Sequence, residues 1–180
     1  MSLLEQLTKL RTAGQNKAEC QTQIQNIVYL IYNDREGEKP SEYFEMLMKH
    51  VAEHSEEYSY KSALLRMFDF VCHYSERVEY TGYVHLMSTR LAELLDLFKS
   101  MNVEKEETGS SSVVTYFSET RKIVRDWKRY FPDEIPVIVE TEKNLMEREQ
   151  RAAERHQRKT ETLKKIDEDR EKVLHVSLFN

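Results

Sequence analysis

The stretch Ala63-Leu-Leu-Arg-Met-Phe-Asp-Phe-Val71 is the most apolar segment of the chain and predicts its central helix. Ser59, a few residues upstream, can cap the start of that helix. A helix with so much apolar surface needs neighbours on several sides. We therefore expect it to lie at the centre of a helical bundle. The side chains expected in the core are Leu64, Met67, Phe68 and Val71.

Capping residues and apolar stripes predict three helices before this segment. Ser2 and Glu5 form a capping-box pattern, and Asn16 can cap a second helix. A third helix is expected to begin near Pro40, after a turn that contains Gly37. In the second and third helices, apolar residues recur at the spacing of one helical face. These residues are Ile24, Ile27, Val28, Ile31, Phe44, Leu47, Met48 and Val51.

Two more helices are predicted after the central segment, with a loop between them. The first spans residues 81–98 and the second runs from about residue 113 to 130. Residues 102–112, NVEKEETGSSS, have almost no apolar periodicity and are expected to form a mobile loop. The second of these helices is expected to direct three side chains into the core, namely Phe117, Val124 and Trp127.

Two prolines indicate where this helical body ends. Pro132 is incompatible with a straight continuation of the helix, whereas Pro136 suits the first turn of a new one. The sequence therefore predicts a helical domain at 1–131 and a charged extended helix at 132–180, which projects and packs along only part of one side. Only one of its two heptad seams is partly apolar, which is too little for a self-sufficient coiled coil. The partly apolar seam consists of Ile138, Leu145, Ala152, Lys159, Ile166 and Val173.

The composition narrows the class of protein further. With 4 glycines and 3 prolines in 180 residues, the chain lacks the frequent turns of sandwiches and barrels, so we expect an all-α fold. A net charge of -5 argues against sequence-specific nucleic-acid binding, which favours a basic face. Two cysteines are too few for a disulfide framework. With no signal peptide or long apolar run in the sequence, we expect an intracellular protein that does not bind membranes.

Two short patterns raise the possibility of catalysis. His50-Val-Ala-Glu-His54 matches H-x-x-E-H, the inverted zinc-protease signature. No third-ligand motif follows, so we favour a polar edge beside the core stripe; a zinc hydrolase using His50, Glu53 and His54 is the alternative. Cys72 lies in the apolar run and is expected to be a buried hydrophobe rather than a nucleophile. We therefore expect no enzyme, no metal and no cofactor.

Protein binding is the expected function, and two groups of charged residues are the candidate contacts. Arg66, Asp69 and His73 are expected on the exposed side of the central helix. Arg125 and Lys128 belong to the basic clusters of the last body helix. The alternative for these clusters is a solvated outer face without a partner.

The order of the pieces resembles the VHS, ENTH and RNA polymerase II tail-interacting domains, which are right-handed superhelices of about six to eight helices. The segment from Lys61 to Tyr74 is similar to their fourth helix, and Asp69 matches an acidic position there. Arg66 and Tyr74 stand where the polymerase-tail readers have tyrosine and asparagine. The resemblance therefore implies the superhelix, and it leaves a tail reader and a membrane-trafficking adaptor as alternative functions.

A closer similarity is to the amino-terminal region of the UV-stimulated scaffold protein A family. It rests on Ser62-Ala63 through Val71, on Trp127-Lys128-Arg-Tyr-Phe131, and on the charged helix that follows. This resemblance implies a nuclear, non-enzymatic scaffold of transcription-coupled nucleotide excision repair. Its implied partners are stalled RNA polymerase II, the Cockayne-syndrome ubiquitin-ligase factor, the repair helicase factor and ubiquitin. The chain would then correspond to the amino-terminal part of such a scaffold.

Overall fold

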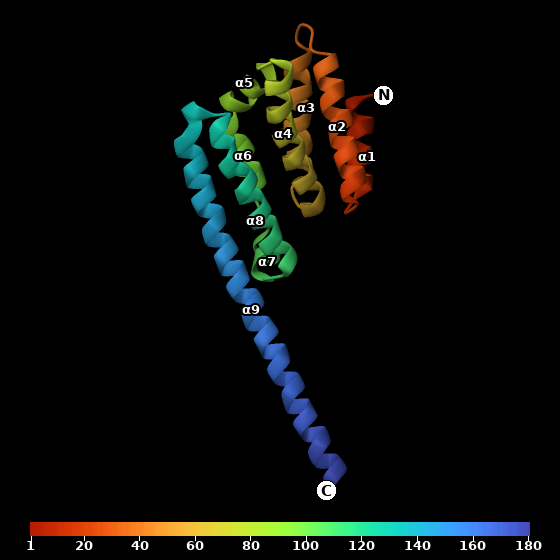
Figure 1. Ribbon diagram of the computed structural model, residues 1–180, viewed down its shortest axis with the longest axis vertical. Helices are drawn as coiled ribbons and strands as arrows, with labels where there is room; N and C mark the ends of the chain where they lie inside the picture. The colour runs from red at the N-terminus through yellow and green to blue at the C-terminus, as the bar shows by residue number, and fades with distance from the viewer.

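The computed structural model describes residues 1–180 and consists of helices and connecting turns, without strands (Figure 1). The all-α prediction is confirmed, and so is the long charged helix at the end. No helix combines the length and the hydropathy needed to cross a bilayer. The helices are α1 (Leu3–Ala13), α2 (Lys17–Asn33), α3 (Lys39–Glu53), α4 (Tyr58–Val78), α5 (Gly82–Thr89), α6 (Leu91–Lys99), α7 (Val103–Glu107), α8 (Ser111–Asp126) and α9 (Ile135–Phe179), with short 3-10 turns η1 (Trp127–Arg129) and η2 (Pro132–Glu134).

Helix α4 occupies the middle of the row of helices in Figure 1 and packs against α1, α2, α5 and α8. This position explains why its sequence is so apolar, because neighbours cover it on several sides. Each of the four side chains expected in its core is at most 2% exposed. Cys72 is buried as well and packs its sulfur beside that of Met87, 3.9 Å away.

The tryptophan completes the contact between α8 and α4. Trp127 begins the 3-10 turn that extends α8, and its side chain is fully buried, as are those of Phe117 and Val124. The indole Nε1 donates a hydrogen bond of 3.0 Å to the Asp69 carboxylate of α4. Burial raises the pKa of Asp69, and the hydrogen bond from Trp127 opposes this rise. The indole therefore supplies both apolar contact and the partner that a half-buried carboxylate requires.

The segment expected to be one helix at 81–98 is two helices that meet at Arg90. Neither glycine nor proline marks this break. The Arg90 guanidinium pairs with Glu93 at 2.9 Å and with Glu45 of α3, which holds the chain at the bend. The change of direction allows both Met87 of α5 and Leu91 of α6 to be buried. The prediction of a single helix at 81–98 was thus wrong, because the chain bends at Arg90, where that side chain pairs with α3.

The expected loop at 102–112 contains the five-residue helix α7. Its side chains are all at least partly exposed, so it has no apolar stripe that could have predicted a helix. Asn102 caps it by accepting a hydrogen bond from the Glu104 backbone N–H at 2.8 Å. A helix this short needs support from outside, and Glu106 receives that support from α9.

Helix α9 is docked along its first half and free along its second (Figure 1). Its first half packs mainly against α8, and also contacts α6 and α7. Of the six heptad positions, Ile138, Leu145 and Ala152 are fully buried, whereas Lys159, Ile166 and Val173 are exposed. Every residue from 156 onward is exposed. The core therefore continues past the boundary predicted at residue 131 as far as Ala152, and only the second half of α9 projects.

Candidate protein-binding groove

A groove with a volume of about 600 Å³ lies where three parts of the chain meet. The turn between α1 and α2 forms one side, the first half of α4 forms the floor, and the start of α8 with α7 forms the other side. We call it the cationic groove, because three of the four charged side chains that line it are basic. The basic side chains are those of Lys17, Arg66 and Lys105, and the acidic one is that of Glu119.

The three basic side chains of the cationic groove have no carboxylate partner, whereas an arginine further along α8 does. Arg121 pairs with Glu149 at 2.8 Å. In the groove, by contrast, the Nε of Arg66 is buried and has no hydrogen-bond partner at all. A buried donor without an acceptor costs about 1–3 kcal/mol. The groove is therefore lined by a guanidinium whose charge no carboxylate of the chain neutralises.

Hydroxyl groups and a helix start add further donors to the cationic groove. Helix α8 begins at its edge, where the Ser110 hydroxyl caps the helix by accepting from Val113 N–H. The backbone N–H groups of Ser111 and Ser112 belong to the first turn, which has no acceptors within the helix. Such a turn carries a partial positive charge that favours anions. The hydroxyl-bearing residues that line the groove are Ser59, Ser62, Ser111, Ser112 and Thr115.

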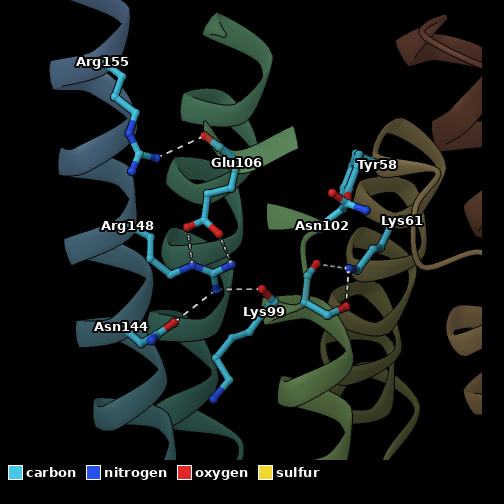
Figure 2. Close-up of polar contacts among 9 residues, drawn as sticks. Tyr58, Lys61, Lys99, Asn102, Glu106, Asn144, Arg148 and Arg155 are labelled. Carbon is cyan, nitrogen blue, oxygen red and sulfur yellow. Dashed lines mark hydrogen bonds and ion pairs between the residues drawn. The ribbon is translucent and has the colours of Figure 1, made fainter. Parts of the chain in front are cut away.

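One wall of the cationic groove is fixed by hydrogen bonds from α4 to the segment after α6 (Figure 2). The Tyr58 hydroxyl accepts from the Asn102 backbone N–H at 3.0 Å. Lys61 donates through Nζ to the Ser100 carbonyl at 2.6 Å and to the Ser100 hydroxyl at 2.9 Å. It also donates to the Ser55 carbonyl at 3.2 Å. These bonds hold Tyr58 in place at the edge of the groove.

Lys61 is a fully buried lysine that has carbonyl and hydroxyl partners instead of a carboxylate. Its ammonium group lies over the rings of Tyr58 and Tyr116, at 5.6 and 5.5 Å from their centres. Burial, reinforced by the charge of Arg148, lowers the pKa of Lys61 from 10.5 to about 8. The folded protein therefore holds this proton less tightly than the unfolded chain does.

This pKa predicts how stability changes with pH. Between about pH 8 and 10.5 the unfolded state binds more protons at Lys61 than the folded state, so the free energy of unfolding rises with pH. Relative to Lys61→Met, the wild type should gain about 2 kcal/mol between about pH 7 and pH 9.5. Urea unfolding of both proteins across this range measures the difference. A difference that does not change with pH would show that Lys61 titrates normally.

Arg148 of α9 fastens α7, which carries Lys105, to the body (Figure 2). Its guanidinium makes two bonds to the Glu106 carboxylate, at 2.8 and 3.1 Å, and one to the Lys99 carbonyl at 2.7 Å. It also lies 4.6 Å from the centre of the Phe117 ring. A paired fork of this kind is among the stronger polar contacts in proteins. The docked half of α9 thus positions one side of the cationic groove.

Of the five residues expected to contact a partner, Arg66 alone lines the cationic groove. Asp69 accepts from Trp127, and its second oxygen lies 3.4 Å from the His73 ring. His73 contacts the Tyr130 hydroxyl through Nδ1 at 2.6 Å. Of the residues expected on the central helix, Arg66 therefore lines the groove, whereas Asp69 and His73 make contacts within the protein.

The second group lies on another part of α8 and in η1. Arg125 is exposed and makes a long contact of 3.5 Å with Asp126. Lys128 pairs with Glu142 of α9 at 2.8 Å, so it helps to dock that helix. The five residues consequently do not form one continuous surface around the groove.

The chain matches no protein-family model, no curated protein and no solved structure. The resemblance to the scaffold family accordingly stays a prediction.

Proposed function

We propose that the chain is a non-enzymatic interaction scaffold whose cationic groove binds an anionic segment of a partner protein. The observation that carries this proposal is the grouping of Arg66, Lys17 and Lys105 around one groove, where none of the three is paired with a carboxylate of the chain. A guanidinium prefers carboxylate and phosphate groups as partners, because their oxygens match its fork of N–H donors. The backbone N–H groups at the start of α8 can add further hydrogen bonds.

The dimensions of the groove and the shape of the molecule agree with this role. A volume of about 600 Å³ suits a few residues of a bound segment rather than a whole domain. The exposed half of α9 offers a second surface, separate from the groove, that can reach another protein (Figure 1). Two separate contact regions on one chain are what a scaffold needs in order to join partners.

The sequence resemblance supports a narrower proposal. The scaffold would act in transcription-coupled nucleotide excision repair in the nucleus, and would connect stalled RNA polymerase II to the Cockayne-syndrome ubiquitin-ligase factor and the repair helicase factor. Affinity capture from nuclear extract before and after ultraviolet damage tests this. Enrichment of polymerase and repair factors would support it, and capture of endocytic proteins would instead favour the membrane-trafficking adaptor.

Peptide binding gives the direct test of the cationic groove. Fluorescence anisotropy would compare a labelled acidic peptide with one phosphoserine, the same peptide with glutamate at that position, and a neutral version. We expect Arg66→Gln to weaken binding of the phosphorylated peptide at least tenfold, because a charged hydrogen bond is worth about 1.5–3 kcal/mol. Its fold should be at least as stable as the wild type, since the change removes a buried donor that has no partner.

The matched control is Arg125→Gln, which removes an exposed arginine of α8 outside the groove. This variant should bind the phosphorylated peptide as the wild type does, apart from a small effect of net charge. Equal losses in the two variants would indicate non-specific attraction and contradict the proposal. So would equal affinity for the acidic and neutral peptides.

A further inference from the structure

A cluster of two histidines and a glutamate lies at the end of α3, outside the cationic groove. His50, Glu53 and His54 are spaced i, i+3, i+4, which places them on neighbouring positions of one helical face. Their potential ligand atoms all lie within 4.8 Å of one another. The two imidazole rings are 4.4 Å apart between centres. Ligand atoms on a tetrahedral zinc ion are about 3.4 Å apart, so small rotations of these side chains would bring the three ligand atoms close enough to bind one ion.

The hydrogen bonds around His54 leave one of its ring nitrogens free for a ligand. Its Nδ1 contacts the Glu57 carboxylate, which can only accept, so this nitrogen carries the proton. The Nε2 of His54 has no hydrogen-bond partner in the protein and is the nitrogen left for a ligand. A carboxylate behind an imidazole is the usual arrangement that orients a metal-binding histidine. Glu57 is itself held by Arg11 of α1 at 2.7 Å.

The hydrogen bonds around His50 also leave one of its ring nitrogens free for a ligand. Its Nε2 lies 2.5 Å from the Tyr60 hydroxyl, which donates its own proton to the Leu7 carbonyl at 3.2 Å. The hydroxyl is thus the partner of His50 Nε2, and Nδ1 of His50 is the ring nitrogen without a hydrogen-bond partner in the protein.

We propose that His50, Glu53 and His54 bind a divalent transition-metal ion, for which Zn²⁺ is the best match. Two imidazoles and one carboxylate form a ligand set that zinc accepts, with a fourth position left for water. Glu53 is exposed and its pairing with Lys49 is long, at 3.7 Å, so it can turn toward an ion at little cost. The bound ion would fasten the end of α3 beside the residues that contact α1 and the start of α4.

Isothermal titration of the full chain with Zn²⁺, after removal of any purification tag and bound metal, tests this site. We expect one ion per chain, and visible absorption bands of four-coordinate geometry when Co²⁺ replaces Zn²⁺. His54→Ala and Glu53→Gln should each weaken Zn²⁺ binding at least tenfold. Both residues are at least partly exposed, so the variants should remain folded.

Two controls separate this site from weak surface binding. Glu56→Gln removes an exposed carboxylate near the cluster and should leave Zn²⁺ binding unchanged. Lys49→Gln releases Glu53 from its ion pair and should leave the affinity unchanged or increase it. Zn²⁺ binding that survives the combined Glu53→Gln and His54→Ala change would overturn the proposal, and so would the absence of binding in the wild type.

Discussion

Replacing Trp127 by alanine is expected to lower the free energy of unfolding by about 3–5 kcal/mol. The side chain is fully buried at the junction of α8 and α4, beside Phe131, whose ring centre is 5.9 Å away. Its loss would leave a cavity that the surrounding helices can fill only in part. It would also remove the hydrogen bond to Asp69, leaving a half-buried carboxylate with the contact to His73 alone.

Trp127→Phe separates the two contributions. It keeps an aromatic ring in the core but removes the Nε1–H donor, so we expect it to be destabilised by less than Trp127→Ala. Urea unfolding followed by circular dichroism is the suitable measurement, because it does not depend on tryptophan fluorescence. A loss below about 1 kcal/mol for Trp127→Ala would mean that the indole does not complete the core.

A second large effect is expected along α9, where the same substitution should give opposite results at two positions. Leu145→Ala should lower the free energy of unfolding by about 2–5 kcal/mol, because Leu145 is fully buried. Leu163→Ala should change it by less than about 0.5 kcal/mol, because Leu163 is 63% exposed. The two positions are separated by a whole number of helical turns, so they lie on the same face of the helix.

The paired comparison removes effects of helix propensity, since both changes are leucine to alanine within one long helix. Thermal and urea unfolding of the two variants measure the difference in stability. Equal effects at Leu145 and Leu163 would contradict the half-docked position of α9. The result also bears on the cationic groove, because Arg148, one turn beyond Leu145, holds α7 in place.

The sequence predicted the helical class and the core well, because apolar spacing directly reports which face of a helix is buried. The seven side chains expected in the core are all buried. Breaks and docking were harder to predict. Arg90 at the bend pairs with Glu45 of α3, and Glu106 of α7 pairs with Arg148 of α9. Contacts of this kind join residues that are far apart in the sequence, so no local pattern indicates them.

The same reason explains what was missed at the candidate site. Arg66 was expected to contact a partner, but Lys17 and Lys105 were not, because they come from other helices and each alone looks like an ordinary surface charge. The serines at 110–112 were assigned to a loop, although Ser110 caps α8 and the other two are its first residues, at the edge of the groove. Asp69 was expected to face a partner, but it accepts a hydrogen bond from Trp127. Polar residues have both surface and structural roles, and only the fold distinguishes them.

The most direct test of the interaction account is an NMR titration of the isotopically labelled chain with the phosphoserine peptide. We predict saturable shifts of the backbone amides that line the cationic groove, such as those of Ser62, Ser111 and Ser112, and no shifts in the exposed half of α9. Shifts that instead map to the surface around His73 and Tyr130, with the groove unchanged, would contradict the account. So would an absence of shifts at saturating peptide.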